Sequence, residues 1–559
     1  MTKIGSGSIG GKAQGLVTIR DIVGSDSVRA IAPDIEVNIP TLTVIATDYF
    51  DRFLEQNDLY EVANSNTRDD VLAHAFQHAD LPAQLVGDLR SLIAQVHTPL
   101  AVRSSSLLED ALREPFAGVY ATKMIPNNQH DPDVRFRKLV EAIKFVYAST
   151  FFEHAKEYVK ITRHDPADER MAVVLQEVVG SRFADRFYPH ISGVGRSFNH
   201  YPVGNADREN GVVDLALGLG RTIVDDGVGW SFSPANPSAA PPFKTVTDML
   251  EQTQLKFWAV NMGAPPAYDP IRETEYLVQG DLTDAERDDT LRFLASTFDP
   301  VDGRIFMGVS GTGPRLIDFA PILKASRIPL CEAVKTLLQR CKDEMKSEVE
   351  IEFAVTLDPK YGVPARLGLL QARPMLVSRD SVELRPENLV TPNTIVASES
   401  VLGNGVIDTI SDIVYVKPGT FSATATQHIP RVLEDLNRRL VAENRPYLLI
   451  GFGRWGTTDS QAGIPVEFSQ ISGAKAIVEA TLPEMNFSLS QGSHFFHNIT
   501  SFQICYFSVP HTADFHIDWN WLDQQPTVAD SEFVRHCRSP RPLVVRVDGS
   551  RGIGLIHHE

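Results

Sequence analysis

Two stretches far apart in the sequence carry the residue types that hold a nucleoside triphosphate. The first, Leu100–Thr122, places Arg103 at the end of an apolar, strand-like run and contains a glycine turn around Gly118. The second, Glu350–Met375, supplies a carboxylate, an amide and a further arginine. A triphosphate requires cations on several sides, closely approaching backbone donors, and carboxylate or amide oxygens for magnesium. We therefore expect the two stretches to form opposite walls of one ATP site.

The second stretch also has the spacing of a hairpin with one polar face. Glu352 and Gln371 lie on two segments of strand character that a hairpin can bring side by side. Arg373 follows Gln371 by two residues, so both side chains lie on the same face of a strand. The alternative is that Glu352 and Gln371 are the ordinary polar positions of an alternating strand.

The glycine-rich opening of the chain presents one lysine. Gly5–Gly10 satisfies the pattern GxGxxG, but a dinucleotide fingerprint requires a preceding strand, and only four residues come before it. A P-loop is excluded because Ala13 follows Lys12, where a serine or threonine would be needed to hold magnesium. A lone lysine is ordinarily a solvated surface charge, so a role for Lys12 depends on the rest of the set.

Six short blocks follow one another in the first 375 residues of the chain. They are GGKAQGL at 10–16, AVRSSSLLED at 101–110, FAGVYAT at 116–122, LQEVV at 175–179, EIEFAV at 350–355 and LLQARPM at 369–375. In this order they resemble the ATP-grasp nucleotide-binding domain of the phosphoenolpyruvate synthase and pyruvate phosphate dikinase family. One block alone would be weak evidence, whereas six in order over a region of large-domain size are a strong signal.

The resemblance implies a role for several residues on the nucleotide side of the site. By position, Lys12 and Arg103 would contact phosphates. Gly118 and Thr122 would belong to the loop over the phosphates, and Gln176 would lie beside the hinge that contacts adenine.

The resemblance also implies the metal ligands and the catalytic cations, with ATP and Mg²⁺ as cofactors. Glu352 and Gln371 would bind magnesium, and Arg373 would face the phosphates and act with Arg103 in catalysis. The sequence departs from the family between the two metal ligands, where residues 356–368 are longer than the usual tight turn. This difference bears on how Glu352 and Gln371 face each other.

The 559 residues exceed what one hydrophobic core usually organises, which predicts more than one domain. We expect an α/β (α+β) protein with an ATP-grasp domain over residues 1–375, a linker over 376–395, and a smaller α/β domain over 396–559. Periodicity predicts helices over 13–23, 67–97, 131–161, 246–261 and 328–346, and strands over 40–47, 171–179 and 349–355.

The C-terminal region contains one candidate phosphoryl carrier. Enzymes of the resembled family pass phosphoryl from ATP to a histidine in a glycine-rich Thr-Ser-His signature, and then to pyruvate in a barrel; the signature is not found here. A barrel of ~250 residues does not fit in 396–559 either. His494 follows a Gly-Ser turn and precedes an expected helix, where backbone amides and the helix dipole favour an attached phosphate. The alternative is a histidine that packs against or caps a helix.

A second GxGxxG pattern lies in the C-terminal region, formed by Gly451, Gly453 and Gly456 after an apolar strand. The residues that follow show no helix, which disfavours a dinucleotide site. Arg454, placed among these glycines, predicts either an anion pocket or a tight loop with an arginine on the surface.

Composition limits the other classes of function. A formal net charge of −18 repels phosphate backbones, so nucleic acid is not expected as a partner. We expect no membrane insertion, because no run approaches ~20 apolar residues and the N-terminus lacks the apolar core of a secretory signal. Four cysteines without metal-ligand spacing fit a reduced compartment and predict a cytoplasmic protein.

The sequence therefore predicts an ATP- and magnesium-dependent phosphotransferase that passes phosphoryl to a histidine carrier or to an unidentified acceptor. The alternative is a non-catalytic ATP- or AMP-binding regulatory module that contacts a protein partner through the C-terminal domain. A dinucleotide-dependent enzyme that uses Gly451–Gly456 is the third hypothesis.

Overall fold

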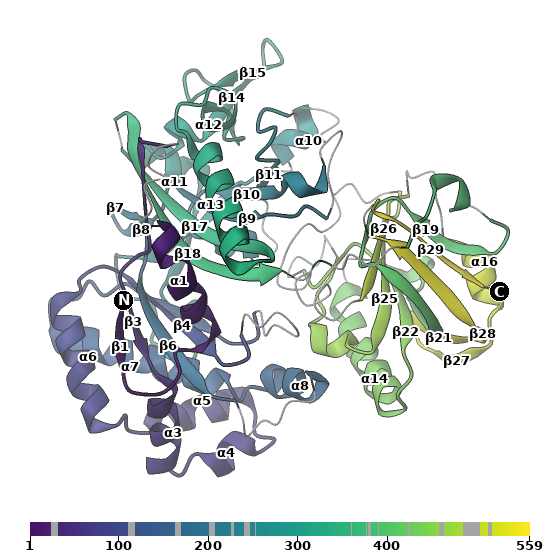
Figure 1. Ribbon diagram of the computed structural model, residues 1–559, viewed down its shortest axis with the longest axis horizontal. Helices are drawn as coiled ribbons and strands as arrows, with labels where there is room; N and C mark the ends of the chain where they lie inside the picture. Colours follow the sequence, from purple (N-terminus) through teal and green to yellow (C-terminus); the bar gives the residue numbers. More distant parts are fainter. Residues whose placement is uncertain are drawn as a thin grey trace. The chain divides into compact units, whose positions relative to one another are not determined.

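The computed structural model describes most of the chain and divides it into two compact units (Figure 1). The described residues are all except 24–31, 110–117, 163–168, 201–206, 225–228, 240–245, 252, 359, 376, 378–381, 390, 423–424, 458–462, 484–503, 512–516, 550 and 559. Unit 1 comprises Met1–Phe198, Glu209–Ile223 and Gly227–Met375, and unit 2 comprises Asn199–Arg208, Val224–Asp226 and Leu376–Glu559. Both units mix helices with sheets, which confirms the predicted α/β class.

Unit 1 contains a five-stranded sheet whose central strands are buried and apolar. The order is β1 (Thr2–Ile4), β3 (Leu42–Ile45), β6 (Met171–Glu177), β4 (Leu100–Ser106) and β5 (Thr122–Ile125). Six of the seven residues of β4 are buried, and the exception is Arg103. A strand covered on both faces reads as a continuous apolar run, which is why the sequence 100–102 signals it well.

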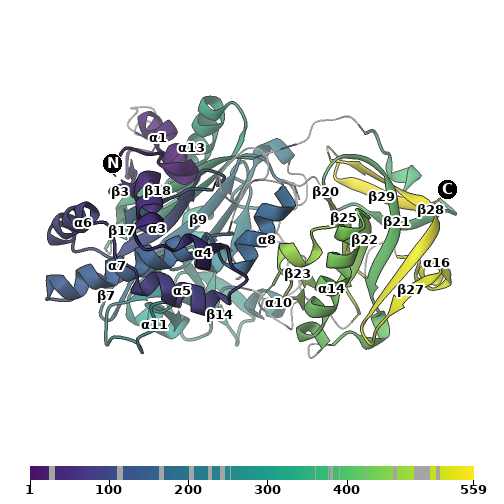
Figure 2. The same cartoon turned by 90° about the horizontal axis from the view of Figure 1, so that it is seen from below.

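Helices cover this sheet through an aromatic core. They are α3 (Thr47–Gln56), α4 (Tyr60–Asn64), α5 (Asp69–His78), α6 (Ala83–Gln95), α7 (Pro132–Ser149) and α8 (Glu153–Thr162). Figure 2 shows α7 beside α3 and α5, and the rings of Phe50 and Tyr147 from α3 and α7 lie 5.1 Å apart. The helical run predicted over 67–97 is thus two helices, α5 and α6.

A six-stranded sheet forms the second half of unit 1. Its order is β11 (Trp230–Phe232), β10 (Val212–Ala216), β9 (Ile191–Arg196), β17 (Glu348–Asp358), β18 (Gly362–Met375) and β2 (Ile35–Asn38). Helix α13 (Leu330–Met345) packs on β17 and buries Val334, Leu337 and Leu338. The β17–β18 hairpin places Glu352 opposite Gln371 and Glu350 opposite Arg373. The predicted hairpin therefore forms, with an irregularity in the register directly after Glu352.

Two smaller sheets complete unit 1, and one of them corrects a prediction. The order of the first is β13 (Leu277–Asp281), β12 (Lys256–Asn261), β8 (Arg186–Tyr188) and β7 (Ser181–Phe183); that of the second is β15 (Arg304–Met307), β14 (Ala295–Asp299) and β16 (Arg315–Ile317). The helix predicted over 246–261 is wrong in its second half, because only α10 (Val246–Glu251) is helical. Residues 257–260 are aromatic and apolar, and residues 256–261 pair with two neighbouring strands, which favours a strand.

The other α-helices in the described residues of unit 1 are α1 (Gly10–Val23), α9 (Arg221–Val224), α11 (Leu282–Arg287) and α12 (Ala320–Leu323). Among the described helices of the chain, none combines the length and the apolar character needed to cross a bilayer.

Unit 2 is built on a nine-stranded mixed sheet. Its order is β19 (Thr394–Ser398), β29 (Ile553–His558), β28 (Val534–Asp548), β21 (Gly405–Val416), β22 (Tyr447–Phe452), β25 (Ala474–Ala480), β26 (Cys505–Val509) and β20 (Val401–Leu402), with β27 (Thr527–Asp530) on β28. Strands β21, β22, β25 and β26 are parallel, α14 (Ile429–Ala442) connects the first two, and α16 (Trp519–Gln524) precedes β27. Leu384 and Leu389, from the predicted linker, are buried in a cluster with Ala397, Ile553 and Leu555.

Candidate functional site

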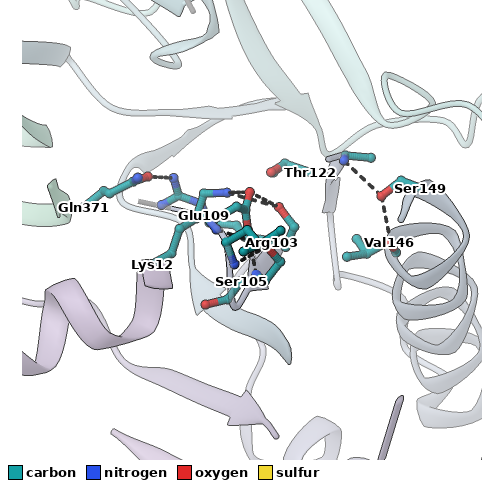
Figure 3. A network of polar contacts seen from close by, with 12 residues as sticks. Lys12, Arg103, Ser105, Glu109, Thr122, Val146, Ser149 and Gln371 are labelled. Atoms are coloured by element: carbon teal, nitrogen blue, oxygen red, sulfur yellow. Dashed lines mark hydrogen bonds and ion pairs between the residues drawn. The ribbon is translucent and has the colours of Figure 1, made fainter. Parts of the chain in front are cut away.

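Arg103 joins the two large sheets of unit 1. Its Nη2 donates to Gln371 Oε1 at 2.7 Å (Figure 3). The same nitrogen donates to Glu352 Oε2 at 3.1 Å. Its Nη1 donates to Gln176 Oε1 at 3.2 Å and to the carbonyl oxygen of Leu370 at 3.1 Å. Four residues that the sequence predicts for one site are therefore in contact, although they come from β4, β6, β17 and β18.

Local strand geometry explains why these side chains meet. Arg103 pairs with Thr122 of β5 on one side of β4 and with Val174 of β6 on the other. Gln176 lies two residues after Val174 and is 2% exposed. Its Nε2 is buried, and no described residue accepts a hydrogen bond from it. The site thus contains a buried amide donor at the position that the resemblance places beside the adenine-contacting hinge.

The start of α1 fixes Lys12 against β4. Gly10 has a φ of 72°, and a Cβ at this position would lie 1.7 Å from the carbonyl oxygen of Ser105, so only glycine fits. The Ser105 hydroxyl accepts from the backbone N of Ala13 at 3.2 Å and donates to the carbonyl oxygen of Ile9 at 2.8 Å. Because the first turn of the helix is pinned to β4, Lys12 Nζ reaches Ser104 Oγ at 3.1 Å and forms an ion pair with Glu109.

Arg373 lies two residues after Gln371 on β18 and belongs to a row of buried charged side chains. Its Nε donates to Glu350 Oε1 at 2.8 Å, and Arg196 Nε donates to Glu350 Oε2 at 2.7 Å. Arg196 Nη1 continues the row to Asp214 Oδ2 at 2.8 Å. Each of these four side chains is at most 14% exposed. Carboxylates and guanidinium groups alternate along this row, and each hydrogen-bonds its neighbour. These bonds hold Arg373 in a fixed position.

Three members of this row, Glu350, Arg196 and Asp214, were not predicted from the sequence. A signal for the first was present, because Glu350 precedes Glu352 by two residues and shares its face of β17. Asp214 is a lone carboxylate in the otherwise apolar strand VVDLA, which is a sign of a buried partner. Arg196 gives no such signal, because a single arginine in a sequence is ordinarily exposed.

The predicted phosphate loop is described only at its C-terminal end. Gly118 has a φ of 70°, which favours glycine, and Thr122 begins β5 directly opposite Arg103. The backbone N of Thr122 donates to Glu273 Oε1 at 3.0 Å. The neighbouring Ala121 N donates to Ser149 Oγ at 3.1 Å (Figure 3). These bonds attach the start of β5 to α7 and to the segment before β13.

Glu169 is a second buried carboxyl group near Glu109. It is 4% exposed and lies shortly before β6, which begins at Met171. Burial raises the pKa of Glu169 to about 7, and the nearby Glu109 carboxylate also raises this pKa.

The two candidate positions of the C-terminal region are only partly described. His494 lies outside the described residues, so its predicted role as a carrier stays a prediction. Arg454 lies on β23 (Arg454–Trp455), which pairs with β24 (Gly463–Ile464). In the described residues after β22 no α-helix follows the glycine pattern before β25, and Phe468–Ile471 form a short 3₁₀ turn.

No preformed metal cage is present in the part of the chain that the structure describes. There, no three His, Cys, Asp or Glu side chains gather as a metal site. Glu352 and Gln371 nevertheless present a carboxylate oxygen and an amide oxygen to the same guanidinium group. This donor set suits Mg²⁺, which binds one or two protein oxygens and takes its other ligands from phosphate and water.

The fold and the cluster define a mixed α/β domain in which cations, a carboxylate and amides from two sheets converge, as nucleotide-binding domains require. The chain belongs to the family of the pyruvate phosphate dikinase AMP/ATP-binding domain, which matches residues 6–390. The family predicted from the six sequence blocks is thereby confirmed.

Three curated relatives match shorter segments. The chain is 27% identical over 190 residues to an uncharacterized phosphotransferase, YvkC, of Bacillus subtilis (strain 168), over 34% of this chain and 20% of that protein. It is 32% identical over 146 residues to a rifampicin phosphotransferase of Streptomyces sviceus, over 26% of this chain and 15% of the relative. It is 32% identical over 164 residues to the prodigiosin synthesizing transferase PigC of Serratia marcescens, over 29% and 16%. The chain thus matches a fifth or less of the length of each relative.

Proposed function

We propose that this protein is an ATP- and magnesium-dependent phosphotransferase of the cytoplasm, with an ATP-grasp site between the five-stranded and six-stranded sheets of unit 1. The observation that carries the proposal is the contact of Arg103 with Glu352 and Gln371 in a chain of an AMP/ATP-binding family. Two of the three relatives named above are phosphotransferases by name, which supports the same class of reaction.

Lys12, Arg103 and Arg373 are the cations that hold the phosphates in this proposal. An ammonium group has three donors, and Ser104 and Glu109 occupy two of those of Lys12, so one remains for a phosphate oxygen. Arg103 uses four of its five donors within the protein. The terminal nitrogens of Arg103 would therefore have to exchange partners in order to bind phosphate, since only its Nε–H is left over, whereas the ammonium group of Lys12 keeps one donor.

Magnesium gives a physical reason for that exchange. When Mg²⁺ is bound it neutralises phosphate charge and polarises the transferring group. Glu352 and Gln371 would be its protein ligands, and the metal would compete with Arg103 for their oxygens. Guanidinium donors of Arg103 that gave up these contacts would be available to phosphate oxygens, where they would stabilise the charge that develops during in-line transfer.

Gln176 supplies the proposed contact to the base. Its buried Nε2 has no acceptor among the described residues, and a buried unsatisfied amide is costly. A nucleobase nitrogen or carbonyl group at this position would accept from it. Gly118 and Thr122 would close over the phosphates from the β5 side.

The phosphoryl acceptor in this proposal is a nucleophile from unit 2 or from a separate molecule, and His494 is the candidate in this chain. The test incubates the purified protein with Mg²⁺ and ATP carrying label in the β- or γ-phosphate. Acid-labile label on the protein that is lost in His494→Gln and kept in the neighbouring His497→Gln supports the carrier.

ATP consumption without labelled protein would point to an external acceptor. Tight ATP binding without turnover across candidate acceptors would instead favour the regulatory module. The absence of both ATP binding and ATP consumption would contradict the proposed function.

A further inference from the structure

Glu109 is a buried carboxylate next to the proposed phosphate-binding lysine. Its side chain is 1% exposed, whereas that of Lys12 is 15% exposed. Oε1 accepts from Lys12 and, at 2.9 Å, from Ser104 Oγ, and Oε2 accepts from the backbone N of Ser106 at 2.8 Å. The backbone N of Glu109 donates to Ser106 Oγ at 3.1 Å. Both carboxylate oxygens are therefore held by β4 before any ligand is considered.

This arrangement orients the ammonium group of Lys12. Ser104 donates its hydroxyl proton to Glu109 and accepts from Lys12 Nζ at 3.1 Å, so the three polar groups form a closed triangle. A lysine side chain on its own populates many rotamers, and fixing it costs conformational entropy. The triangle already orders the Lys12 side chain in the free protein. Its one remaining donor therefore points in a fixed direction before a ligand binds.

We propose that Glu109 is a positioning residue for the nucleotide: with Ser104, it holds Lys12 in the orientation that binds a phosphate oxygen. This inference rests on the proposed function, because it concerns the same site. Figure 3 shows Lys12 and Glu109 grouped with Arg103. A carboxylate that only balanced a surface charge would have no need of the buried contacts with Ser104 and Ser106.

The test compares two ligands that differ only in their phosphates. Calorimetry measures the Kd of adenylyl imidodiphosphate with Mg²⁺, and of adenosine, for the wild type and for Glu109→Gln. We expect the triphosphate analogue to bind about tenfold more weakly to the variant, the effect of one charge-assisted hydrogen bond, and adenosine to bind equally well. In a Lys12→Ala background, Glu109→Gln should have no further effect on the affinity, because the residue acts through Lys12.

Glu275→Gln is the matched control. It removes the carboxylate from another buried pair of unit 1, Lys123 with Glu275, in which both side chains are at most 2% exposed and 2.7 Å apart. This control should lower Tm and leave both affinities unchanged, and Glu109→Asp keeps the charge as a second variant if Glu109→Gln does not fold.

Unchanged or tighter analogue binding in Glu109→Gln, or an equal loss for both ligands, would overturn the positioning role alone. A wild type that binds neither ligand would overturn the proposed function and this inference with it.

Discussion

Arg103 and Gln371 lie 268 residues apart in the sequence, and a 2.7 Å hydrogen bond from Nη2 to Oε1 joins them. The bond connects the five-stranded sheet to the six-stranded sheet, so it is a direct contact between these two parts of unit 1. Arg103, which is proposed to bind phosphate, is therefore hydrogen-bonded to Gln371, which is proposed to bind magnesium.

The first prediction concerns Arg103 itself. Arg103→Ala should lower kcat by about 10²-fold or more, the usual effect of removing a donor that stabilises developing charge. Arg103→Lys should restore little, because a lysine cannot reproduce contacts to four acceptors with one planar group. Steady-state ATP turnover measures both effects.

The control for this prediction is Arg90→Ala, which removes an exposed arginine whose partner, Asp133, lies on the surface. Turnover of Arg90→Ala should equal that of the wild type. Wild-type turnover in Arg103→Ala would contradict the proposed role of Arg103.

The second prediction links metal to nucleotide. If Mg²⁺ displaces Arg103 from Glu352 and Gln371, bound Mg²⁺ should raise the affinity for ATP, and bound ATP should raise the affinity for Mg²⁺. Coupling between two ligands typically changes an affinity by about tenfold. ATP binding to the wild type, titrated with Mg²⁺ and with a chelator, should show this change. Glu352→Gln should reduce this change, because the substitution removes the carboxylate that is proposed to bind the metal. A wild type with the same ATP affinity in both conditions would argue against the two metal ligands.

The third prediction concerns the buried charges beside the site. Glu350→Gln leaves Arg373 and Arg196 without the carboxylate that both contact, and an uncompensated buried charge typically costs about 3–5 kcal/mol. Urea unfolding should show a loss of this order. Glu61→Gln, at an exposed position of α4, should change the free energy of unfolding little. A small effect of Glu350→Gln would show that the row of buried charged side chains does not hold Arg373.

The fourth prediction is a pH dependence caused by Glu169. Because burial raises its pKa in the folded protein to about 7, the folded state keeps a proton that the unfolded state loses near pH 4.5. The contribution of Glu169 to stability is therefore present below about pH 4.5 and declines as the pH rises to about 7.

Glu169→Gln removes this decline, so the variant should gain stability over the wild type between pH 5 and pH 8, on the order of 3 kcal/mol. Unfolding free energies measured at several pH values give the comparison. A constant difference between variant and wild type across this range would contradict the buried, protonated carboxyl group.

The sequence predicted the parts of the site that local patterns carry. The apolar run before Arg103 and the alternation around Glu352 each define a strand without reference to the rest of the chain. The order of the six blocks supplied the long-range information that they belong to one site, and the contact of Arg103 with Glu352 and Gln371 agrees with it.

What the sequence missed depends on pairing between distant strands. Residues 256–261 form a strand because β8 and β13 pair with them on either side. The periodicity within the segment does not predict this pairing. Arg196 joins the buried charges because β9 lies between β10 and β17, which places it between Asp214 and Glu350. Partner strands of this kind come from topology, which a single sequence does not display.

The central claim is that Lys12, Arg103, Glu352, Gln371 and Arg373 surround the phosphates of one nucleotide. An ATP derivative with a reactive acyl group on its terminal phosphate acylates lysines near the phosphates, and mass spectrometry of the digested protein identifies them. The account predicts that Lys12 is modified and that excess ATP with Mg²⁺ protects it. Unprotected labelling of Lys12, or ATP-protected labelling only of a distant lysine such as Lys342 at the end of α13, would contradict it.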